Sequence, residues 1–281
     1  MNSRTGASVR RRILGRRLRL LRERAGMTME AAAPALYWSV SKLSRIETAQ
    51  QLIDVHGVKS MLDLYGAGGE QWAELTTLAR EAAQRGWWRA YGLGDNSYIV
   101  LESEATRVQE VTIGFVPGLL QVARYSEALF LASPLRRDRA EVEREVAVRM
   151  IRQQRLTAAE DDLHLEAIVA EAALHNPVGG PAVLREQLDH LLIAAELDNV
   201  SMQVLPTSAG AHPALASGFI ILNFGDLDEP DIGYVEHALG AVQLEKEDDV
   251  AQARLKFDQL RSLALATAES LALIERAAGQ I

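Results

Sequence analysis

The sequence contains no cysteine among its 281 residues. A chain without cysteine has no disulfide framework, no thiol nucleophile, no cysteine-ligated zinc finger and no cysteine-ligated iron–sulfur cluster. It also lacks a run of about 20 apolar residues, which a membrane-spanning helix needs. No apolar signal-peptide segment follows the arginine-rich N-terminus. We therefore expect a cytoplasmic protein that does not interact with a membrane.

Aromatic residues are scarce as well, at 5% of the chain, while apolar residues make up 48% and charged residues 24%. The last two fractions are ordinary for a globular protein and exclude disorder or a collagen-like chain. The length is close to twice that of a typical domain, which favours two domains.

Positive charge is in deficit overall, because the formal net charge is −8. The average conceals two regions of opposite sign. Residues 1–50 hold 11 basic and three acidic residues, a net charge of +8, whereas residues 51–281 hold 19 basic and 35 acidic residues, a net charge of −16. A basic N-terminal region on an acidic remainder is a two-module pattern, and the basic region is the part that a phosphate backbone would attract.

Three short helices are predicted in the basic region. Leu14, Leu18 and Leu21 share one helical face, and Gly26 follows where a helix would end. Two further helices are expected at about 29–36 and from Val40 to about Thr48, with Thr28 and Ser39 as their N-caps. Short helices joined by tight turns are typical of a helix-turn-helix, which places its second helix of the pair in the DNA major groove.

The segments LGRRLRLLRERAGMT (14–28), SVSKLSRIE (39–47) and LDLYG (62–66) resemble the Cro/CI-like, XRE-type helix-turn-helix domain. The remainder resembles the C-terminal domain, of unknown function, of actinobacterial regulators of that type. The matching segments are RGWWRAY (85–91), VPGLLQVARYSEAL (116–129), EAALHNPVGGPAVLREQL (171–188), VSMQVLPTSAGAHPAL (200–215) and YVEHALGAVQLE (234–245).

The resemblance implies a transcriptional regulator that binds double-stranded DNA. It also implies a C-terminal domain that senses a small hydrophobic ligand or a small partner protein. A homodimer is expected, because a short helix-turn-helix gains affinity by pairing half-sites about one helical turn apart. The residues expected to contact or face DNA are Arg16, Arg17, Thr28, Ser39, Ser41, Lys42, Ser44 and Arg45. Arg22 and Glu47 are placed to form the ion pair that ties the first helix to the third in this fold.

Several positions depart from the family pattern. Met29 and Val40 stand where the family usually has glutamine, whose amide can bind adenine or phosphate. Tyr37 stands where glycine is usual, and a left-handed backbone there would be strained. The family's Asn-Gly after the third helix is Thr48-Ala49, and Pro34 lies inside the second helix, which we expect to bend or break near Ala33. The region therefore either recognises an unusual operator, with Val40 on a thymine methyl, or keeps the fold as a scaffold or dimerisation module without binding DNA.

The acidic remainder is predicted to be α+β or α/β with a modest sheet. The expected domains are a helix-turn-helix domain over 1–66, a linker helix and aromatic segment over 67–92, and a C-terminal domain over 93–281. Strands are expected at 165–170, 200–205, 218–224, 232–236 and 241–244. Helices are expected at 102–112, 117–132, 138–157, 181–197 and 248–277.

No catalytic motif stands out, so no catalytic residue, metal or cofactor is expected. The candidates for a ligand pocket are Trp87, Trp88, Gln121, Arg124, Tyr125, Glu171 and His175. Each also has a plainer role, as a core anchor, a cap or a solvated group. If the N-terminal region no longer binds DNA, this pocket could instead bind a hydrophobic metabolite, with a cofactor-independent cyclisation or isomerisation as the corresponding activity.

Overall fold

A computed structural model describes residues 9–84, 86–93, 98–133, 138–158, 163–225, 227, 229–237 and 239–281. The chain forms two compact units. We call residues 1–104 with 226–229 the head unit, and residues 105–225 with 230–281 the body unit. None of the helices in the described part of the chain is long and apolar enough to cross a membrane.

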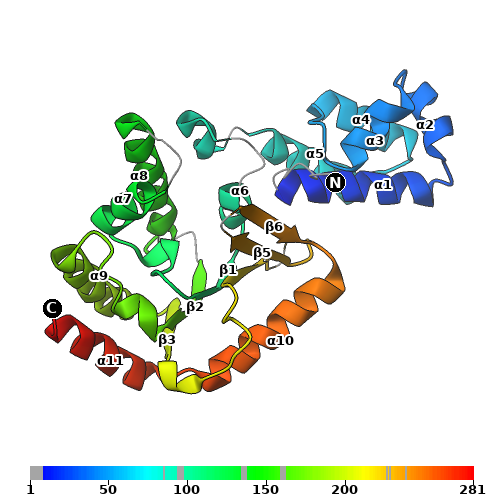
Figure 1. The fold of residues 1–281 in the computed structure, drawn as a ribbon. Coiled ribbons are helices and arrows are strands. Elements are labelled where there is room, and N and C mark those ends of the chain that lie inside the picture. Colours follow the sequence, from blue (N-terminus) through cyan, green and yellow to red (C-terminus); the bar gives the residue numbers. More distant parts are fainter. Residues whose placement is uncertain are drawn as a thin grey trace. The chain divides into compact units, whose positions relative to one another are not determined.

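The head unit is helical (Figure 1). Its helices are α1 (Val9–Arg24), α2 (Met29–Ala35), α3 (Val40–Glu47), α4 (Val55–Leu64), α5 (Gly69–Ala83), the 3-10 helix η1 (Trp87–Tyr91) and α6 (Tyr98–Glu102). Side-chain caps fix three of the starts: Thr28 accepts from the Ala31 amide, Ser39 from the Lys42 amide, and Asp54 from the Gly57 amide. These caps set the directions in which α2, α3 and α4 leave their turns.

A single apolar core holds α1 to α5 together. Its fully buried members include leucine, isoleucine and methionine side chains from four of the helices, namely Leu14, Leu18, Leu43, Ile46, Met61, Leu62 and Leu75. The leucine face predicted from the sequence for the first helix is therefore the buried face of α1. Burial of such side chains is the main stabilising contribution in a unit of this size.

Helix α2 runs unbroken through Pro34, so the expected break near Ala33 is wrong. The proline is the sixth of seven residues. It has no amide hydrogen, so the carbonyl of Glu30, four residues earlier, loses the hydrogen bond that it would otherwise accept. The Leu36 amide still donates to the carbonyls of Ala32 and Ala33. Both Glu30 and Pro34 are exposed, so water can bind the orphaned carbonyl.

The body unit is built on a six-stranded mixed sheet in the order β3-β2-β1-β4-β5-β6. The strands are β1 (Arg107–Thr112), β2 (His164–Ala170), β3 (Val200–Leu205), β4 (Phe219–Asn223), β5 (Ile232–His237) and β6 (Gly240–Leu244). Strands β1, β2 and β3 pair in parallel, whereas β4, β5 and β6 continue the sheet from β1 in antiparallel pairs. This confirms the predicted strands and an α+β domain with a modest sheet.

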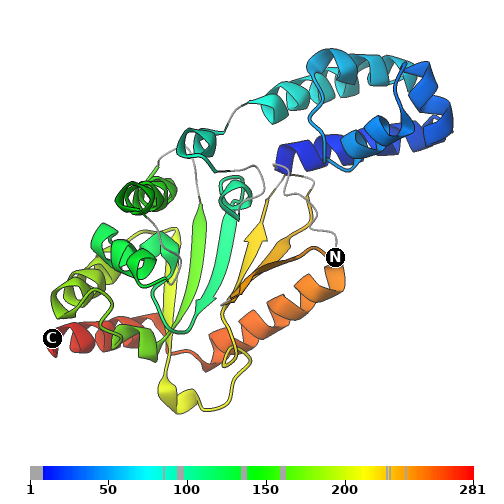
Figure 2. The same ribbon diagram turned by 45° about the horizontal axis from the view of Figure 1, so that its top comes forward.

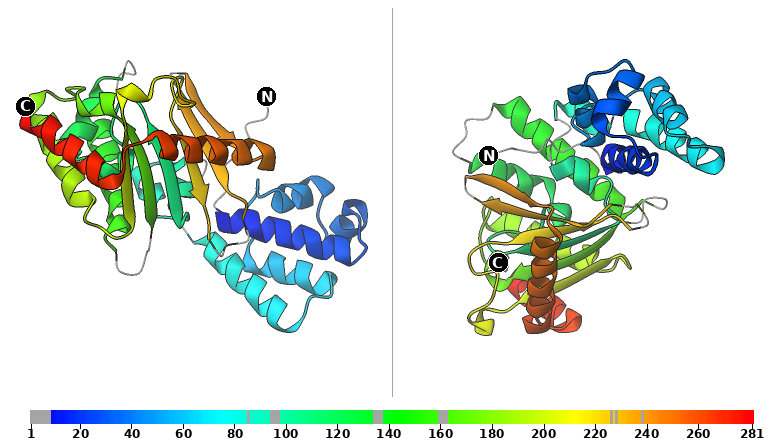
Figure 3. Two further views of the ribbon diagram at one scale, coloured as in Figure 1. Left: turned by 90° about the horizontal axis from the view of Figure 1, so that it is seen from below. Right: turned by 90° about the vertical axis from the view of Figure 1, so that its right-hand side faces the viewer.

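Helices pack on both faces of this sheet (Figures 2 and 3). They are the 3-10 helix η2 (Gly118–Leu120), α7 (Ala123–Leu131), α8 (Arg139–Gln153), η3 (Gln154–Leu156), η4 (Glu171–Leu174), α9 (Pro181–Ala194), η5 (Thr207–Ala209), α10 (Glu247–Leu263) and α11 (Thr267–Gly279). Helix α10 crosses one face, where Phe257 and Leu260 pack on Val111, Ile168 and Ile221. Helices α7 to α9 form the crossovers between the parallel strands and cover the other face.

Two of the expected helices are wrong in extent. The segment 102–112 contains the central strand β1, whose sequence resembles a helix because Glu110 and Gln109 interrupt its apolar residues. The segment 248–277 is two helices, α10 and α11, which are separated where the Leu265 amide donates to the Val204 carbonyl of β3. In both places tertiary pairing with the sheet overrides the local pattern.

Candidate nucleic-acid interface

Helix α3 buries one face in the head unit and leaves the other open. Leu43, Ile46 and Glu47 are buried, so Ser41, Arg45 and Thr48 on the opposite side of the helix point outward, and Val40 and Ser44 flank them. The outward set combines one apolar side chain, Val40 at 39% exposure, with hydroxyl and cationic groups. Its members are Val40, Ser41, Ser44, Arg45 and Thr48.

Two residues at the start of α3 hold the outer face in place. The Ser39 hydroxyl accepts from the Lys42 amide at 3.1 Å and so caps the helix. The Lys42 ammonium lies 4.1 Å from the centroid of the Trp38 ring, where the ring quadrupole attracts a cation. Thr28 caps α2 in the same way as Ser39 caps α3, and both hydroxyls lie on exposed turns. The structure thus brings Thr28, Ser39, Ser41, Lys42, Ser44 and Arg45 onto the α2–α3 pair.

A buried ion pair fixes the far end of α3. The Arg22 guanidinium donates to both carboxylate oxygens of Glu47, at 2.8 and 2.9 Å, and to the Met27 carbonyl at 2.8 Å. Both partners are about 95% buried. The hydrogen bond to Glu47 raises the pKa of Arg22, and burial beside Glu47 raises the pKa of Tyr65 to about 12. The tie predicted from the sequence is confirmed, and it sets how α3 is presented from α1.

Both turns that flank α3 contain a non-glycine residue in the left-handed region. Tyr37 has φ 57° and Ala49 has φ 59°, at the two positions where the family pattern has glycine. A β-carbon is disfavoured at such φ values, and the cost per residue is on the order of 1 kcal/mol. Tyr37 is 97% exposed and therefore gains almost no burial in compensation.

We expect Tyr37→Gly to stabilise the head unit by about 1 kcal/mol, because glycine adopts this φ without strain. Thermal unfolding followed by tryptophan fluorescence measures the change. Tyr37→Ala is the matched control, because alanine removes the aromatic ring but keeps the β-carbon. A Tyr37→Gly variant no more stable than Tyr37→Ala would contradict the strain argument.

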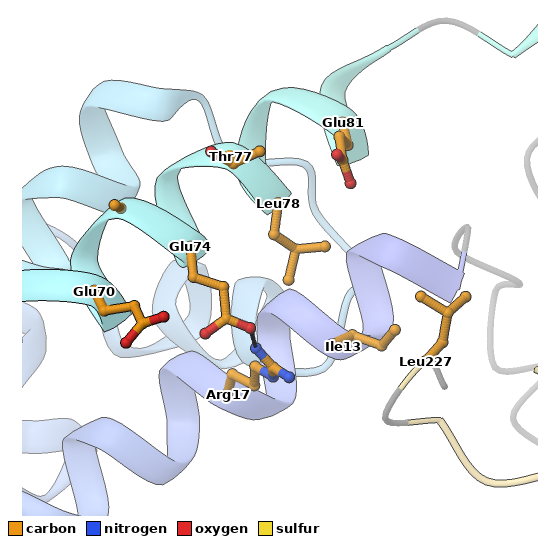
Figure 4. Close-up of a pocket in the computed structure, with 9 residues that line it drawn as sticks. Ile13, Arg17, Glu70, Glu74, Thr77, Leu78, Glu81 and Leu227 are labelled. Atoms are coloured by element: carbon orange, nitrogen blue, oxygen red, sulfur yellow. Dashed lines mark hydrogen bonds and ion pairs between the residues drawn. The ribbon is translucent and has the colours of Figure 1, made fainter. Parts of the chain in front are cut away.

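The remaining predicted DNA contacts, Arg16 and Arg17, are engaged elsewhere in the head unit. Arg16 donates to Glu229 at 2.8 Å, next to Arg12, which donates to the other oxygen of the same carboxylate. Arg17 of α1 donates to Glu74 of α5, and Figure 4 shows the two side chains facing each other. A role for Arg16 and Arg17 in DNA binding stays a prediction, and it would require these ion pairs to open.

The Arg17–Glu74 pair lies in a groove of about 490 Å³ between α1 and α5. Its apolar floor includes Ile13 and Leu78, and its rim on α5 is acidic (Figure 4). The lining residues are Ile13, Arg17, Glu70, Ala73, Glu74, Thr77, Leu78, Glu81 and Leu227. The carboxylates of this groove include Glu74, which is paired with Arg17, so a phosphate would have to displace Glu74 to reach this arginine.

Two of the pocket candidates lie in the packed interior of the body unit. Tyr125 and Gln121 are fully buried, and the Val116 amide donates to the Tyr125 hydroxyl at 3.4 Å. The Gln121 amide donates to the Val116 carbonyl, and its oxygen accepts from Ser126 and Arg149. Their polar groups therefore join the loop after β1 to α7 and α8.

The other pocket candidates are dispersed. Trp87 and Trp88 belong to the head unit, where their rings meet edge to face with centroids 6.3 Å apart. Arg124 is exposed and pairs with Glu186 at 3.1 Å. Glu171 accepts from the Thr207 amide at 2.7 Å, which lowers the pKa of its carboxyl group, and His175 lies exposed at the end of η4. Their role as ligand contacts stays a prediction.

Sequence reasoning missed a groove of about 310 Å³ in the body unit, between α10 and strands β4 to β6. Phe219, Val235 and Leu244 line it, with Asp249 and Lys256 from α10. These residues become neighbours only through strand pairing, so no local motif marks them. Among the described residues, no group of three or more histidines or acidic side chains is placed to hold a metal ion.

Two family models match the chain. The model described as a helix-turn-helix domain matches residues 13–75. The model described as a domain of unknown function (DUF5753) matches residues 96–276, which is well over half of the chain. No curated protein and no solved structure matches. The chain therefore has an N-terminal helix-turn-helix domain and belongs to the family that is defined by the DUF5753 domain.

Proposed function

We propose that this protein is a DNA-binding transcriptional regulator of the XRE type, and that it acts in the cytoplasm. The observation that carries the proposal is the outward face of α3, which presents Val40, Ser41, Ser44 and Arg45 beside a capped N-terminus. The helix-turn-helix match supports the same conclusion. An exposed helix with hydroxyl, cationic and small apolar side chains suits the major groove, where each base pair has its own pattern of donors, acceptors and methyl groups.

The roles follow from the chemistry of each side chain. Arg45 is exposed and can donate two hydrogen bonds to a guanine edge or bind a phosphate. Lys42 and the hydroxyls of Thr28 and Ser39 are suited to phosphate oxygens, which fix the position of the helix on the duplex. Val40 is suited to contact the methyl group of thymine. This contact would supply the base specificity that a glutamine supplies elsewhere in the family.

The direct test is a binding titration with full-length protein on DNA from around its own gene. We expect Arg45→Ala to weaken binding about tenfold to a hundredfold, because a good bidentate contact contributes about 1–3 kcal/mol. Arg80→Ala is the matched control. It removes the same charge from an exposed position on α5, away from the α2–α3 pair, and should change affinity little.

A second readout separates specific from non-specific attraction. Removing one cation that neutralises a phosphate lowers the slope of log affinity against log salt by about 0.9. We expect Lys42→Ala to lower that slope by about one unit and to weaken binding to all sequences alike. Equal effects of Arg45→Ala and Arg80→Ala, or no binding at low salt by folded protein, would contradict the proposal.

The body unit is proposed to regulate the head unit by binding a small hydrophobic ligand or a small partner protein. The groove between α10 and β4–β6 supports a ligand, because apolar side chains line it together with polar ones, among them Gln252, Asp249 and Lys256. The alternative, an enzyme acting on a hydrophobic metabolite, would need polar groups that face an open cavity. Gln121 and Tyr125, which the sequence suggested for that role, make hydrogen bonds within the packed interior instead.

A further inference from the structure

The two edges of the body sheet differ in how their backbone groups are satisfied. At the β3 edge, the Val204 amide donates to the Ser270 hydroxyl and the Val204 carbonyl accepts from the Leu265 amide, both at 2.9 Å. The Gln203 side chain donates to the Leu265 carbonyl. The segment between α10 and α11 therefore covers β3, which is one way in which proteins protect an edge strand.

The β6 edge has no such cover from the residues that the structure describes. Strand β6 is last in the sheet order, and its residues Gly240, Ala241 and Val242 are exposed. It also lacks the usual protection against edge pairing, since Gly240–Leu244 contains no charged residue and no proline. The strand is uncharged within a region, residues 51–281, whose net charge is −16. It is therefore a place where two copies of this acidic chain can meet without like charges facing each other.

The β5–β6 register shows which backbone groups of β6 point outward. His237 pairs with Gly240 across a two-residue connection, and Val235 pairs with Val242. In such a hairpin the pair next to the turn is hydrogen-bonded, and bonded pairs then alternate along the ladder. Gly240, Val242 and Leu244 thus bond to β5. The amide and carbonyl groups of Ala241 and Gln243 face the open edge.

We propose that a second copy of this chain pairs through β6, antiparallel and centred on Val242. In this register Ala241 lies opposite Gln243 of the other copy, so the outward groups of the two strands match. The pair of Ala241 with Gln243 therefore occurs twice in the dimer, and the two occurrences are related by the two-fold axis of the dimer. The two Val242 side chains, each 46% exposed, then meet as a directly opposed, non-hydrogen-bonded pair. This pairing deepens the proposed function, because two joined copies carry two heads for two DNA half-sites.

The contact is small. Five-residue strands bury well under the roughly 1,200 Å² of a standard stable interface, so the free protein should exchange between monomer and dimer. DNA with two half-sites should then favour the dimer by mass action.

Cysteine cross-linking tests the register, because the natural chain contains no cysteine. In a non-hydrogen-bonded antiparallel pair the Cα atoms lie about 4.5 Å apart, within the range that a disulfide bridges. We expect Val242→Cys to form a disulfide dimer rapidly under mild oxidation, without DNA. Ala241→Cys should cross-link at least about tenfold more slowly, because its own counterpart is displaced along the strand. Leu255→Cys, on α10 and 71% exposed, controls for random collision.

Sedimentation equilibrium of two further variants tests the hydrogen bonds. Gln243→Pro removes an outward amide and leaves the β5–β6 bonds intact, and an edge position of this kind accommodates proline. We expect it to raise the dimer dissociation constant at least tenfold relative to Gln243→Ala.

The proposal would be overturned if Val242→Cys formed cross-links no faster than Leu255→Cys. Because neither assay contains DNA, this failure is distinguishable from a failure of DNA binding.

Discussion

Replacing Glu47 with alanine is expected to lower the free energy of unfolding of the head unit by about 3–5 kcal/mol. The substitution leaves the Arg22 guanidinium buried, with its two donors to the carboxylate unpaired. The Met27 carbonyl and the half-exposed Glu23 carboxylate, 3.6 Å away, would compensate only part of the charge, and a buried charge without its full set of partners costs more than the pair stabilises. The same change releases the C-terminal end of α3 from α1, so DNA affinity should fall with it.

Tryptophan fluorescence isolates this effect, because all four tryptophans of the chain, at 38, 72, 87 and 88, belong to the head unit. The double variant Arg22→Met with Glu47→Leu is the informative control. It removes both charges and fills the space with apolar side chains, so we expect it to be more stable than Glu47→Ala. A Glu47→Ala variant destabilised by less than about 1 kcal/mol would show that the pair is not buried as described.

Adding one methyl group at Gly15 is expected to destabilise the head unit by about 1–3 kcal/mol. A β-carbon there would lie 2.8 Å from the backbone carbonyl oxygens of both Ile46 and Glu47. These atoms belong to the end of α3, so α1 and α3 would have to separate. The resulting destabilisation should exceed the gain of nearly 1 kcal/mol that alanine normally brings to a helix interior.

Gly57 provides the matched control for Gly15, because it also lies inside a helix. A β-carbon at Gly57 would meet only side-chain atoms, Cγ1 of Ile53 at 2.8 Å and Oδ1 of Asp54 at 3.3 Å, whereas at Gly15 it would meet backbone atoms that belong to another helix. We therefore expect Gly57→Ala to be less destabilising than Gly15→Ala in the same fluorescence assay, because side chains can shift where a packed helix backbone cannot. Equal effects of the two substitutions would mean that α1 and α3 are not in the close contact described.

The head unit is largely predictable from the sequence because its signals are local. The leucine spacing of α1 and the caps Thr28 and Ser39 each follow from a few nearby residues. The Arg22–Glu47 pair joins residues 25 positions apart and is expected only from the resemblance to the helix-turn-helix family. The expected break near Ala33 is wrong because the proline affects only the carbonyl of Glu30, which is exposed to water, while the Thr28 cap and the Leu36 amide still hold both ends of α2.

The body unit is less predictable because its decisive contacts are long-range. Strand β1 pairs with β2 and with β4, whose residues follow more than 50 and 100 positions later in the chain. Its local sequence, with Gln109 and Glu110 inside the strand, gives no clear period of two. The break between α10 and α11 contains neither glycine nor proline, and it forms because Leu265 bonds to β3.

The contacts of the candidate pocket residues are likewise hard to predict from the sequence. Gln121 and Tyr125 are residue types that could orient a ligand, and nothing in the sequence indicates that Val116, Ser126 and Arg149 would satisfy their polar groups. Conversely, Phe219, Val235 and Leu244 are ordinary apolar strand residues. They line a groove only because β4, β5 and β6 are neighbours.

Sequence recognition by the outward face of α3 is tested most directly by selecting bound duplexes from a random pool. The selection uses full-length protein at about 0.15 M salt, where non-specific attraction is largely screened. We predict that the natural chain enriches one motif, which is two-fold symmetric if the copies pair, and that Arg80→Ala enriches it too whereas Arg45→Ala does not. A pool that stays random, although the protein is folded and the Arg22–Glu47 tie is intact, would contradict DNA recognition by α3.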